Sequence, residues 1–150
     1  MTRRFVVVAA TWFGTGLSPV APGTVGTLGA IPLYMAMARL PLWLYLAILV
    51  PFFFLSSWVA GRAQEEFGQK DPGTVVIDEV IGYLITMAGV TADWRSILAG
   101  FLLFRFFDVV KVWPARYFDR RMRNGYGVVL DDVAAGLYAC AALHLLLGYL

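Results

Sequence analysis

The chain has 150 residues, of which 60% are hydrophobic and 15% are charged, whereas about a quarter of the residues in an average soluble domain are charged. A domain of this length cannot bury so much apolar surface, so we expect one integral membrane domain over residues 1–150. The net charge of +2 gives no support for nucleic-acid binding, and the single cysteine excludes an internal disulfide and a cysteine-ligated metal site.

The first part of the chain combines a short basic and apolar segment with a glycine-rich loop. Arg3 and Arg4 precede the apolar run 5–10, which resembles the start of a signal peptide, but the turn-rich stretch 14–29 is not a simple cleavage region. Glycines and hydroxyl groups that lead into a helix can present backbone N–H groups to an anion. We therefore predict that Ser18 and Thr24 bind phosphate, with Thr24 as a candidate helix cap; a plain structural turn is the alternative.

Two apolar segments are long enough to cross a bilayer, which takes about 20 helical residues. Residues 40–60 are uncharged and rich in Leu, Phe and Trp, and Pro51 should kink or divide this helix. Residues 133–150 are the second candidate. A stripe at every fourth position of this segment suits close helix packing: Gly136, Cys140, His144 and Gly148.

Two further apolar segments, 27–38 and 80–92, are too short to span, because a helix of about 13 residues reaches only about 20 Å. We expect each to form one arm of a hairpin, with tips near Arg39 and near residues 93–95; short helices packed in a shallow bundle are the alternative. Of the twelve Lys and Arg residues, only Arg39 and Arg95 fall at these tips. Positive residues favour the cytoplasm, so the charged loops are predicted to be cytoplasmic. The predicted fold is thus an all-α membrane bundle with two spanning helices and shorter hairpin or re-entrant helices.

The usual phosphatase nucleophiles are absent from the charged loops. The one histidine, His144, lies deep in the last apolar segment, where we expect it to form a hydrogen bond between helices. Cys140 is not followed by an Arg-bearing phosphate loop, no Asp-x-Asp pair begins a strand, and the Walker motif is missing. Histidine, cysteine and common aspartyl-phosphate mechanisms of the α/β type are therefore disfavoured.

Acidic residues gather where the apolar segments meet the charged loops. A pair precedes each of the runs 80–92 and 133–150, and a single acid ends the run 101–107: Asp78, Glu79, Asp131, Asp132 and Asp108. One acid per helix would serve as a cap, whereas paired acids at a membrane boundary repel each other unless a cation joins them. Oxygen-only ligands suit Mg²⁺, so we predict that these five residues bind Mg²⁺ and are catalytic, with helix capping as the alternative.

Basic residues surround Asp108. Arg105, Asp108 and Lys111 are spaced by three and would share one face of a continued helix. Arg binds phosphate oxygens with two hydrogen bonds and Lys supplies a point charge, so Arg105 and Lys111 are predicted to bind substrate phosphate. Four more basic residues follow: Arg116, Arg120, Arg121 and Arg123. We predict the same role for the first two and contacts with anionic lipid head groups for the last two; lipid contacts are the alternative for the whole cluster.

Several of these segments resemble the phosphatidylglycerophosphatase A family. The resemblance rests on GTGLSP at 14–19 with APGTVG at 21–26, the Asp78-Glu79 pair, FRFFD at 104–108, and YG at 126–127 leading to Asp131-Asp132. The family commonly has Lys-Pro-Trp-Pro, whereas Val112 follows Lys111 here. The missing proline affects the geometry of this turn, but the lysine is retained. The resemblance implies an all-helical protein of the bacterial cytoplasmic membrane that hydrolyses phosphatidylglycerophosphate, a phospholipid in the bilayer, with Mg²⁺.

Other functions remain open from the sequence. One alternative is a phosphatase of another membrane lipid phosphate, such as phosphatidate or a prenyl diphosphate. Another is a cation transporter or a lipid-binding protein without catalysis, although transport acids should lie mid-membrane and most acids here lie outside the apolar runs. Direct attack by water and an aspartyl-phosphate intermediate at Asp108 both fit this set of residues. The number of metal ions and the oligomeric state also stay open from the sequence.

Overall fold

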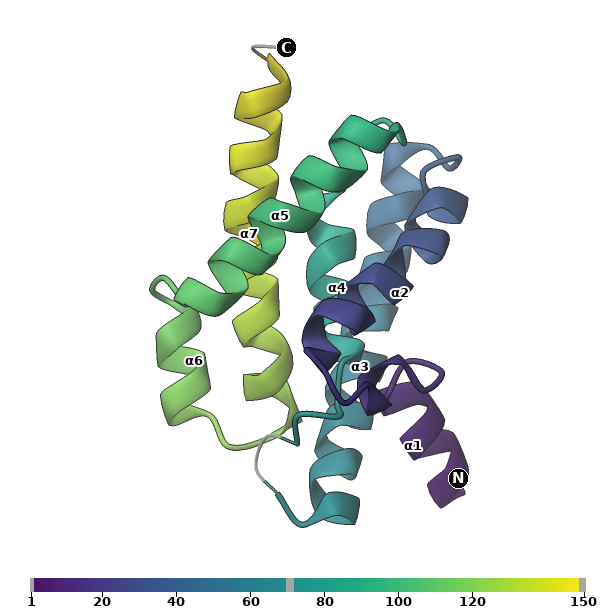
Figure 1. Ribbon diagram of the computed structural model, residues 1–150, viewed down its shortest axis with the longest axis vertical. Helices are drawn as coiled ribbons and strands as arrows, with labels where there is room; N and C mark the ends of the chain where they lie inside the picture. Colours follow the sequence, from purple (N-terminus) through teal and green to yellow (C-terminus); the bar gives the residue numbers. More distant parts are fainter. Residues whose placement is uncertain (1, 70–71, 149–150) are drawn as a thin grey trace.

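The computed structural model describes residues 2–69 and 72–148. Within these ranges the chain forms an all-helical bundle (Figure 1), which confirms the predicted fold class. In chain order, the helices are α1 (Arg3–Ala10), the short 3₁₀ helix η1 (Thr15–Leu17), α2 (Pro22–Met37), α3 (Leu42–Phe67), α4 (Ile77–Thr86), α5 (Trp94–Val110), α6 (Ala115–Arg121) and α7 (Gly125–Gly148).

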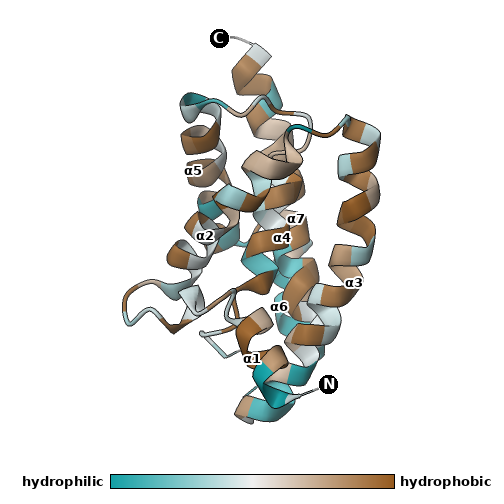
Figure 2. Ribbon diagram, turned by 90° about the vertical axis from the view of Figure 1, so that its right-hand side faces the viewer, coloured by the Kyte–Doolittle hydropathy of each residue, from teal (hydrophilic) through white to brown (hydrophobic). Residues whose placement is uncertain are grey.

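The helices α3 and α7 are long and apolar enough to cross a bilayer, with 26 and 24 residues. At 1.5 Å per residue they reach about 39 and 36 Å, which exceeds the roughly 30 Å of the hydrocarbon core. Only 28% of the apolar window of α3 is buried inside the protein, and Trp43, Phe54 and Trp58 are exposed. Figure 2 shows that much of the α3 ribbon is brown, the colour of hydrophobic residues. This exposure is what contact with lipid requires, whereas a core helix of a soluble protein would be mostly buried.

Several helix boundaries differ from the predictions, and those of α7 and α4 change the position of the acids. The helix α7 begins at Gly125 instead of residue 133, so Asp131 and Asp132 lie inside it, about two turns from its start. The helix α4 begins at Ile77, which places Asp78 and Glu79 within its first turn. The prediction that these acids precede their helices is therefore wrong. Hydropathy marks the part of a helix that faces apolar surroundings, whereas the helix itself begins where its first N–H groups find partners.

Asn124 provides such a partner at the start of α7, because its side-chain oxygen accepts a hydrogen bond from the N–H of Gly127 at 3.1 Å. At the other end, α7 is described up to Gly148. The last two residues of the predicted span 133–150 lie outside the described residues. So do residue 70, which belongs to the predicted basic loop, and residue 71, which begins a segment that resembles the family.

The short segments form the arms of hairpins, as expected. The turn between α2 and α3 and the turn between α4 and α5 lie at the same end of the bundle as the end of α7 (Figure 1). The connections from α3 to α4 and from α6 to α7 lie at the opposite end. Asp93 caps α5 by accepting hydrogen bonds from the N–H groups of Arg95 and Ser96 at 3.0 and 3.1 Å. The charged loops are thus gathered at one end, as the hairpin prediction requires.

The helix α4 lies at the centre of the bundle, between α2, α3, α5 and α7. It packs most closely on α7, where a Cβ atom added to Gly136 would lie 2.5 Å from the carbonyl oxygen of Gly82. Glycine at this crossing lets the two backbones approach, as the small-residue stripe of α7 predicted. His144 of the same stripe also contacts the turn after α4, where its Nε2 lies 2.9 Å from the carbonyl oxygen of Ala88. This close α4–α7 packing positions the acidic residues that follow.

Candidate active site

Five carboxylates from three helices converge toward the end of the bundle that carries the charged loops. Asp78, Glu79 and Asp132 each offer an oxygen atom, and these atoms lie within 4.8 Å of one another; we call this set the α4 carboxylate group. Asp108, Asp131 and Asp132 meet the same criterion and form the α5 carboxylate group. Asp132 belongs to both groups, so the structure offers two adjacent positions for a cation.

The carboxylates are buried and incompletely paired. Asp132 is 2% exposed and Asp78 is 7% exposed. Four of their buried carboxylate oxygens have no hydrogen-bond partner among the described residues: Asp78 Oδ1, Glu79 Oε2, Asp131 Oδ1 and Asp132 Oδ1. Burial of a charged oxygen without a partner is costly. These residues therefore fit a divalent cation that prefers oxygen ligands, because such an ion would supply the missing partner.

Helix capping, the alternative explanation for the acids, does not account for this arrangement. The N-cap of α4 is Val76, and no side chain caps this helix. Asp131 and Asp132 lie inside α7, whose first turn is capped by Asn124 instead. The carboxylate oxygens of these acids therefore do not cap the helices.

The pKa of Glu79 reflects the crowding of negative charge. Burial raises this pKa well above its ordinary value, neighbouring Asp78 raises it further, and Asp108 does so as well, whereas Arg105 lowers it. A raised pKa of a carboxyl group means that its ionised form is disfavoured. A cation bound between these carboxylates would relieve that cost.

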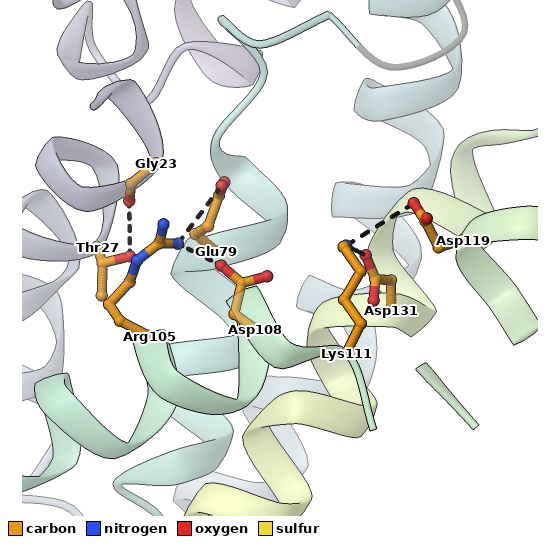
Figure 3. A network of polar contacts seen from close by, with 8 residues as sticks. All are labelled: Gly23, Thr27, Glu79, Arg105, Asp108, Lys111, Asp119 and Asp131. Carbon is orange, nitrogen blue, oxygen red and sulfur yellow. Dashed lines mark hydrogen bonds and ion pairs between the residues drawn. The ribbon is translucent and has the colours of Figure 1, made fainter. Parts of the chain in front are cut away.

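Arg105 contacts one member of each carboxylate group (Figure 3). Its guanidinium group is hydrogen-bonded to Asp108, three residues along the same helix, and its Nη1 lies 4.0 Å from Glu79 Oε1. The predicted proximity of Arg105 and Asp108 is therefore present. Both side chains are mostly buried, so the guanidinium group is held at the contact between α4 and α5.

The start of α2 packs on this ion pair. A Cβ atom added to Gly23 would lie 2.6 Å from Glu79 Oε1 and 3.2 Å from Arg105 Nη1. The carbonyl oxygen of Gly23 accepts a hydrogen bond of 2.8 Å from the buried hydroxyl of Thr27. The glycine-rich loop thus brings backbone, and not a side chain, against Glu79 and Arg105 (Figure 3).

Lys111 reaches the site from a loop. The helix α5 ends at Val110 and Lys111 has a left-handed backbone with φ of 52°, so the prediction that it continues the helical face of Arg105 is wrong. Its Nζ is hydrogen-bonded to Asp131 and lies 3.7 Å from Asp119. Burial alone would lower the pKa of Lys111, but the hydrogen bond and ion pair with Asp131 raise it above its ordinary value. Lys111 is therefore a fixed cation beside the α5 carboxylate group.

Four predicted phosphate-binding residues lie elsewhere on these elements. Ser18 lies in the loop before α2 and its hydroxyl donates a hydrogen bond of 2.9 Å to the carbonyl of Val20. Thr24 lies in the first turn of α2 and does not cap it: the N-cap is Ala21, so the capping prediction is wrong. Pro at the first helical position needs no N–H acceptor, and the helix starts there.

The other two are Arg116 and Arg120, which are exposed on α6. They line a surface pocket of about 180 Å³ with Trp113, Tyr117 and Arg121. Phosphate binding by Ser18, Thr24, Arg116 and Arg120 stays a prediction.

Three residues of this site were not singled out from the sequence. Gly23 lies in the glycine-rich motif, and this motif was the only sequence signal for it. Thr27 follows one helical turn later. Asp119 lies on α6 and contacts Lys111, and nothing in its spacing from the other acids indicated this contact.

The sequence profile of phosphatidylglycerophosphatase A matches residues 8–147. The chain belongs to this family. The phosphatidylglycerophosphatase A of Escherichia coli K12 is 40% identical over 136 residues, which cover 90% of this chain and 79% of the relative. That of Haemophilus influenzae is 39% identical over 132 residues, with 87% and 81% covered. A putative phosphatidylinositol-3-phosphatase of Bacteroides thetaiotaomicron is 39% identical over 141 residues, with 89% and 87% covered.

None of the solved structures gives a significant match to the chain. Membership of the phosphatidylglycerophosphatase A family, together with the two long apolar helices, indicates a protein of the bacterial inner membrane. The family match includes the α4 and α5 carboxylate groups in full, since all five acids lie within residues 8–147.

Proposed function

We propose that this protein is a Mg²⁺-dependent lipid phosphatase that hydrolyses phosphatidylglycerophosphate to phosphatidylglycerol and inorganic phosphate. The observation that carries the proposal is the convergence of buried, incompletely paired carboxylates beside Arg105 and Lys111. A phosphomonoester carries up to two negative charges, and a site of this composition can bind it through cations held by the acids and through the two basic side chains. The names of two relatives at about 40% identity support the substrate.

The roles of the side chains follow from their contacts. Asp132, shared by the two carboxylate groups, would hold cations at both positions, with Asp78 and Glu79 on one side and Asp108 and Asp131 on the other. When bound, Mg²⁺ supplies positive charge to the phosphate and makes a nearby water more acidic. One carboxylate of the α4 carboxylate group accepts the proton of the attacking water. Arg105 and Lys111 neutralise the charge that develops on the phosphoryl oxygens.

The location of the site suits a lipid head group. The carboxylates come from the start of α4, the end of α5 and the first two turns of α7, while the exposed apolar surfaces of α3 and α7 continue toward the end of the bundle that carries the hairpin tips. Positive loops favour the cytoplasmic side. The phosphate of a lipid in the inner leaflet would then meet the acids at the boundary between water and hydrocarbon, facing the cytoplasm.

Phosphate release by the purified protein in detergent tests the proposal. Phosphatidylglycerophosphate, phosphatidate and phosphatidylinositol 3-phosphate should be compared under titration with Mg²⁺, the last because of the name of the Bacteroides relative. We expect the highest kcat/KM with phosphatidylglycerophosphate, loss of activity with EDTA and recovery with Mg²⁺. A higher kcat/KM for another lipid would overturn the substrate, and release that is indifferent to divalent cations would overturn the mechanism.

A chemical trap separates the two routes to hydrolysis. Water attack leaves no phosphate on the protein, whereas attack by Asp108 would leave an aspartyl-phosphate that acid quenching preserves. We propose water attack, because the Asp108 carboxylate is already hydrogen-bonded to Arg105. Labelled phosphate that remains on wild-type protein but not on Asp108→Asn would contradict this.

A further inference from the structure

A crevice between α3 and α7 lies outside the candidate active site. Its wider part is an apolar groove of about 630 Å³, lined by α3, α4 and α7 and including Val50, Phe53 and Leu137. Its other part is a polar pocket of about 520 Å³ that includes Trp58, Arg62, Arg123 and Tyr126. Neither part is lined by a carboxylate of the α4 or α5 carboxylate group. Both volumes lie in the range of small-molecule sites, about 300–1,000 Å³.

The two parts are neighbours along α3. On α3, the groove residues Val50 and Phe53 and the pocket residues Ser57 and Gly61 follow one another at intervals of three or four, so they share one face. The rings of Phe53 in the groove and Tyr126 in the pocket have centroids 6.1 Å apart. The polar pocket and the apolar groove therefore follow one another along α3 and α7, and the contacting rings of Phe53 and Tyr126 lie where the two meet.

The change in polarity from the groove to the pocket matches a membrane boundary. The pocket lies where α3 passes from its apolar part to Gly61 and Arg62. Trp58 and Tyr126 are exposed there, and such side chains prefer the interface between lipid and water. The groove continues from this point toward the apolar parts of α3 and α7. A molecule that occupies both parts of the crevice thus needs a polar head and a long apolar tail.

The charge of the polar end selects an anionic head group. Two basic residues, Arg62 and Arg123, and one acid, Glu65, line it, and the first N–H groups of α7 lie beside them. Arg62 contacts Glu65 at 3.0 Å, but both side chains are more than half exposed. An exposed pair of this kind contributes little free energy, so a phosphate can replace Glu65 as the partner of Arg62.

We propose that the α3–α7 crevice is a binding site for a second lipid, an anionic glycerophospholipid whose phosphodiester contacts Arg62 and Arg123 and whose acyl chain lies in the groove. This site is separate from the carboxylates that act on the substrate. Because it depends on geometry and charge at α3 and α7, it stands or falls independently of the proposed reaction.

Quenching of Trp58 by brominated lipids tests the proposal. The protein is reconstituted with EDTA into phosphatidylcholine vesicles, and dibrominated phosphatidylglycerol or dibrominated phosphatidylcholine replaces part of the lipid. The signal of Trp58 is the difference between the protein and Trp58→Phe. We expect saturable quenching by the anionic lipid at a low mole fraction, with half-saturation raised roughly 5-fold for each arginine removed in Arg62→Gln and Arg62→Gln/Arg123→Gln.

A matched control removes the same charge elsewhere. Arg4 and Arg39 are exposed and line neither part of the crevice, so Arg4→Gln/Arg39→Gln should keep the wild-type half-saturation. Cys140→Phe, which adds bulk inside the groove, should weaken quenching while leaving both arginines in place. Equal quenching by the two brominated lipids would show ordinary bilayer contact only and overturn the proposal. If Trp58 becomes shielded from both lipids as the protein concentration rises, a second copy of the chain covers the crevice. This result would also overturn the proposal.

Discussion

The two carboxylate groups share Asp132 but differ in how their negative charge is balanced. In the α5 carboxylate group, Asp108 is hydrogen-bonded to Arg105 and Asp131 to Lys111. In the α4 carboxylate group, Arg105 approaches Glu79 only to 4.0 Å. The α4 carboxylate group therefore has the greater need of a cation, and the α5 carboxylate group already holds two positive side chains in place.

This difference suggests a division of roles. A divalent cation gains most where negative charge is least compensated, which favours tight binding at the α4 carboxylate group. The basic side chains at the α5 carboxylate group are positioned before any substrate arrives, so a phosphate can exchange with the carboxylates as their partner without much reorganisation. On this view one group binds the metal firmly, and the other receives the phosphate.

Replacement of the shared residue should have the largest effect, because Asp132→Asn removes a ligand from both groups. We expect phosphate release to fall by about 10³-fold or more, the scale of losing a charge-stabilising group in an active site. The apo protein should unfold at the same or a higher temperature, since one buried negative charge is gone from a crowded cluster. Phosphate-release kinetics and thermal unfolding in EDTA measure the two quantities.

Glu65→Gln provides the control for Asp132→Asn, because Glu65 is an exposed acid on α3 outside both groups. It should retain wild-type activity. An active Asp132→Asn variant, or one that fails to reach the membrane while Glu65→Gln does, would contradict the assignment of Asp132 as a shared ligand.

Asp78→Asn and Asp131→Asn compare the groups directly. If the α4 carboxylate group binds the metal, Asp78→Asn should raise the Mg²⁺ concentration for half-maximal activity by about 10- to 100-fold. Asp131→Asn should raise it less and should mainly raise KM, because Lys111 loses its hydrogen-bond partner and its position. Mg²⁺ titrations at saturating lipid and lipid titrations at saturating Mg²⁺ separate the two effects. Equal shifts in both titrations for both variants would remove the distinction between the groups.

Much of this arrangement could be predicted from the sequence, for local reasons. Apolar runs identified the two helices that are long and apolar enough to cross a bilayer, because lipid requires continuous apolar surface. The acids stood out because paired charges beside such runs are costly without a partner. The contact between Arg105 and Asp108 follows from a spacing of three on one helix. Each of these inferences needs only neighbours in the chain.

The features that could not be predicted depend on contacts between residues distant in the chain and on the positions of helix ends. Lys111 was expected on the face of α5, but a left-handed residue ends that helix and turns the lysine toward Asp131 on α7. The early start of α7 depends on the cap at Asn124, which hydropathy does not register. The packing of Gly23 on Glu79 requires the tertiary arrangement of α2 and α4. Local patterns thus identified the candidate acidic and basic residues, while packing determined which of these charges are in contact.

Gly23→Ala should have the smallest effect of these variants and tests how rigidly Arg105 is held between the two groups. The added methyl group would lie 2.6 Å from Glu79 Oε1, so the start of α2 or the ion pair must shift, at a cost of about 1–3 kcal/mol of stability. We expect kcat/KM to fall by roughly 10-fold, since a displaced Arg105 stabilises phosphoryl charge less well. Gly73→Ala is the matched control, because a Cβ there meets nothing within 4 Å, and it should leave activity unchanged. If both alanine variants behave alike, the contact between the α2 backbone and the Arg105–Glu79 pair is unimportant for catalysis, and Arg105 is held by Asp108 alone.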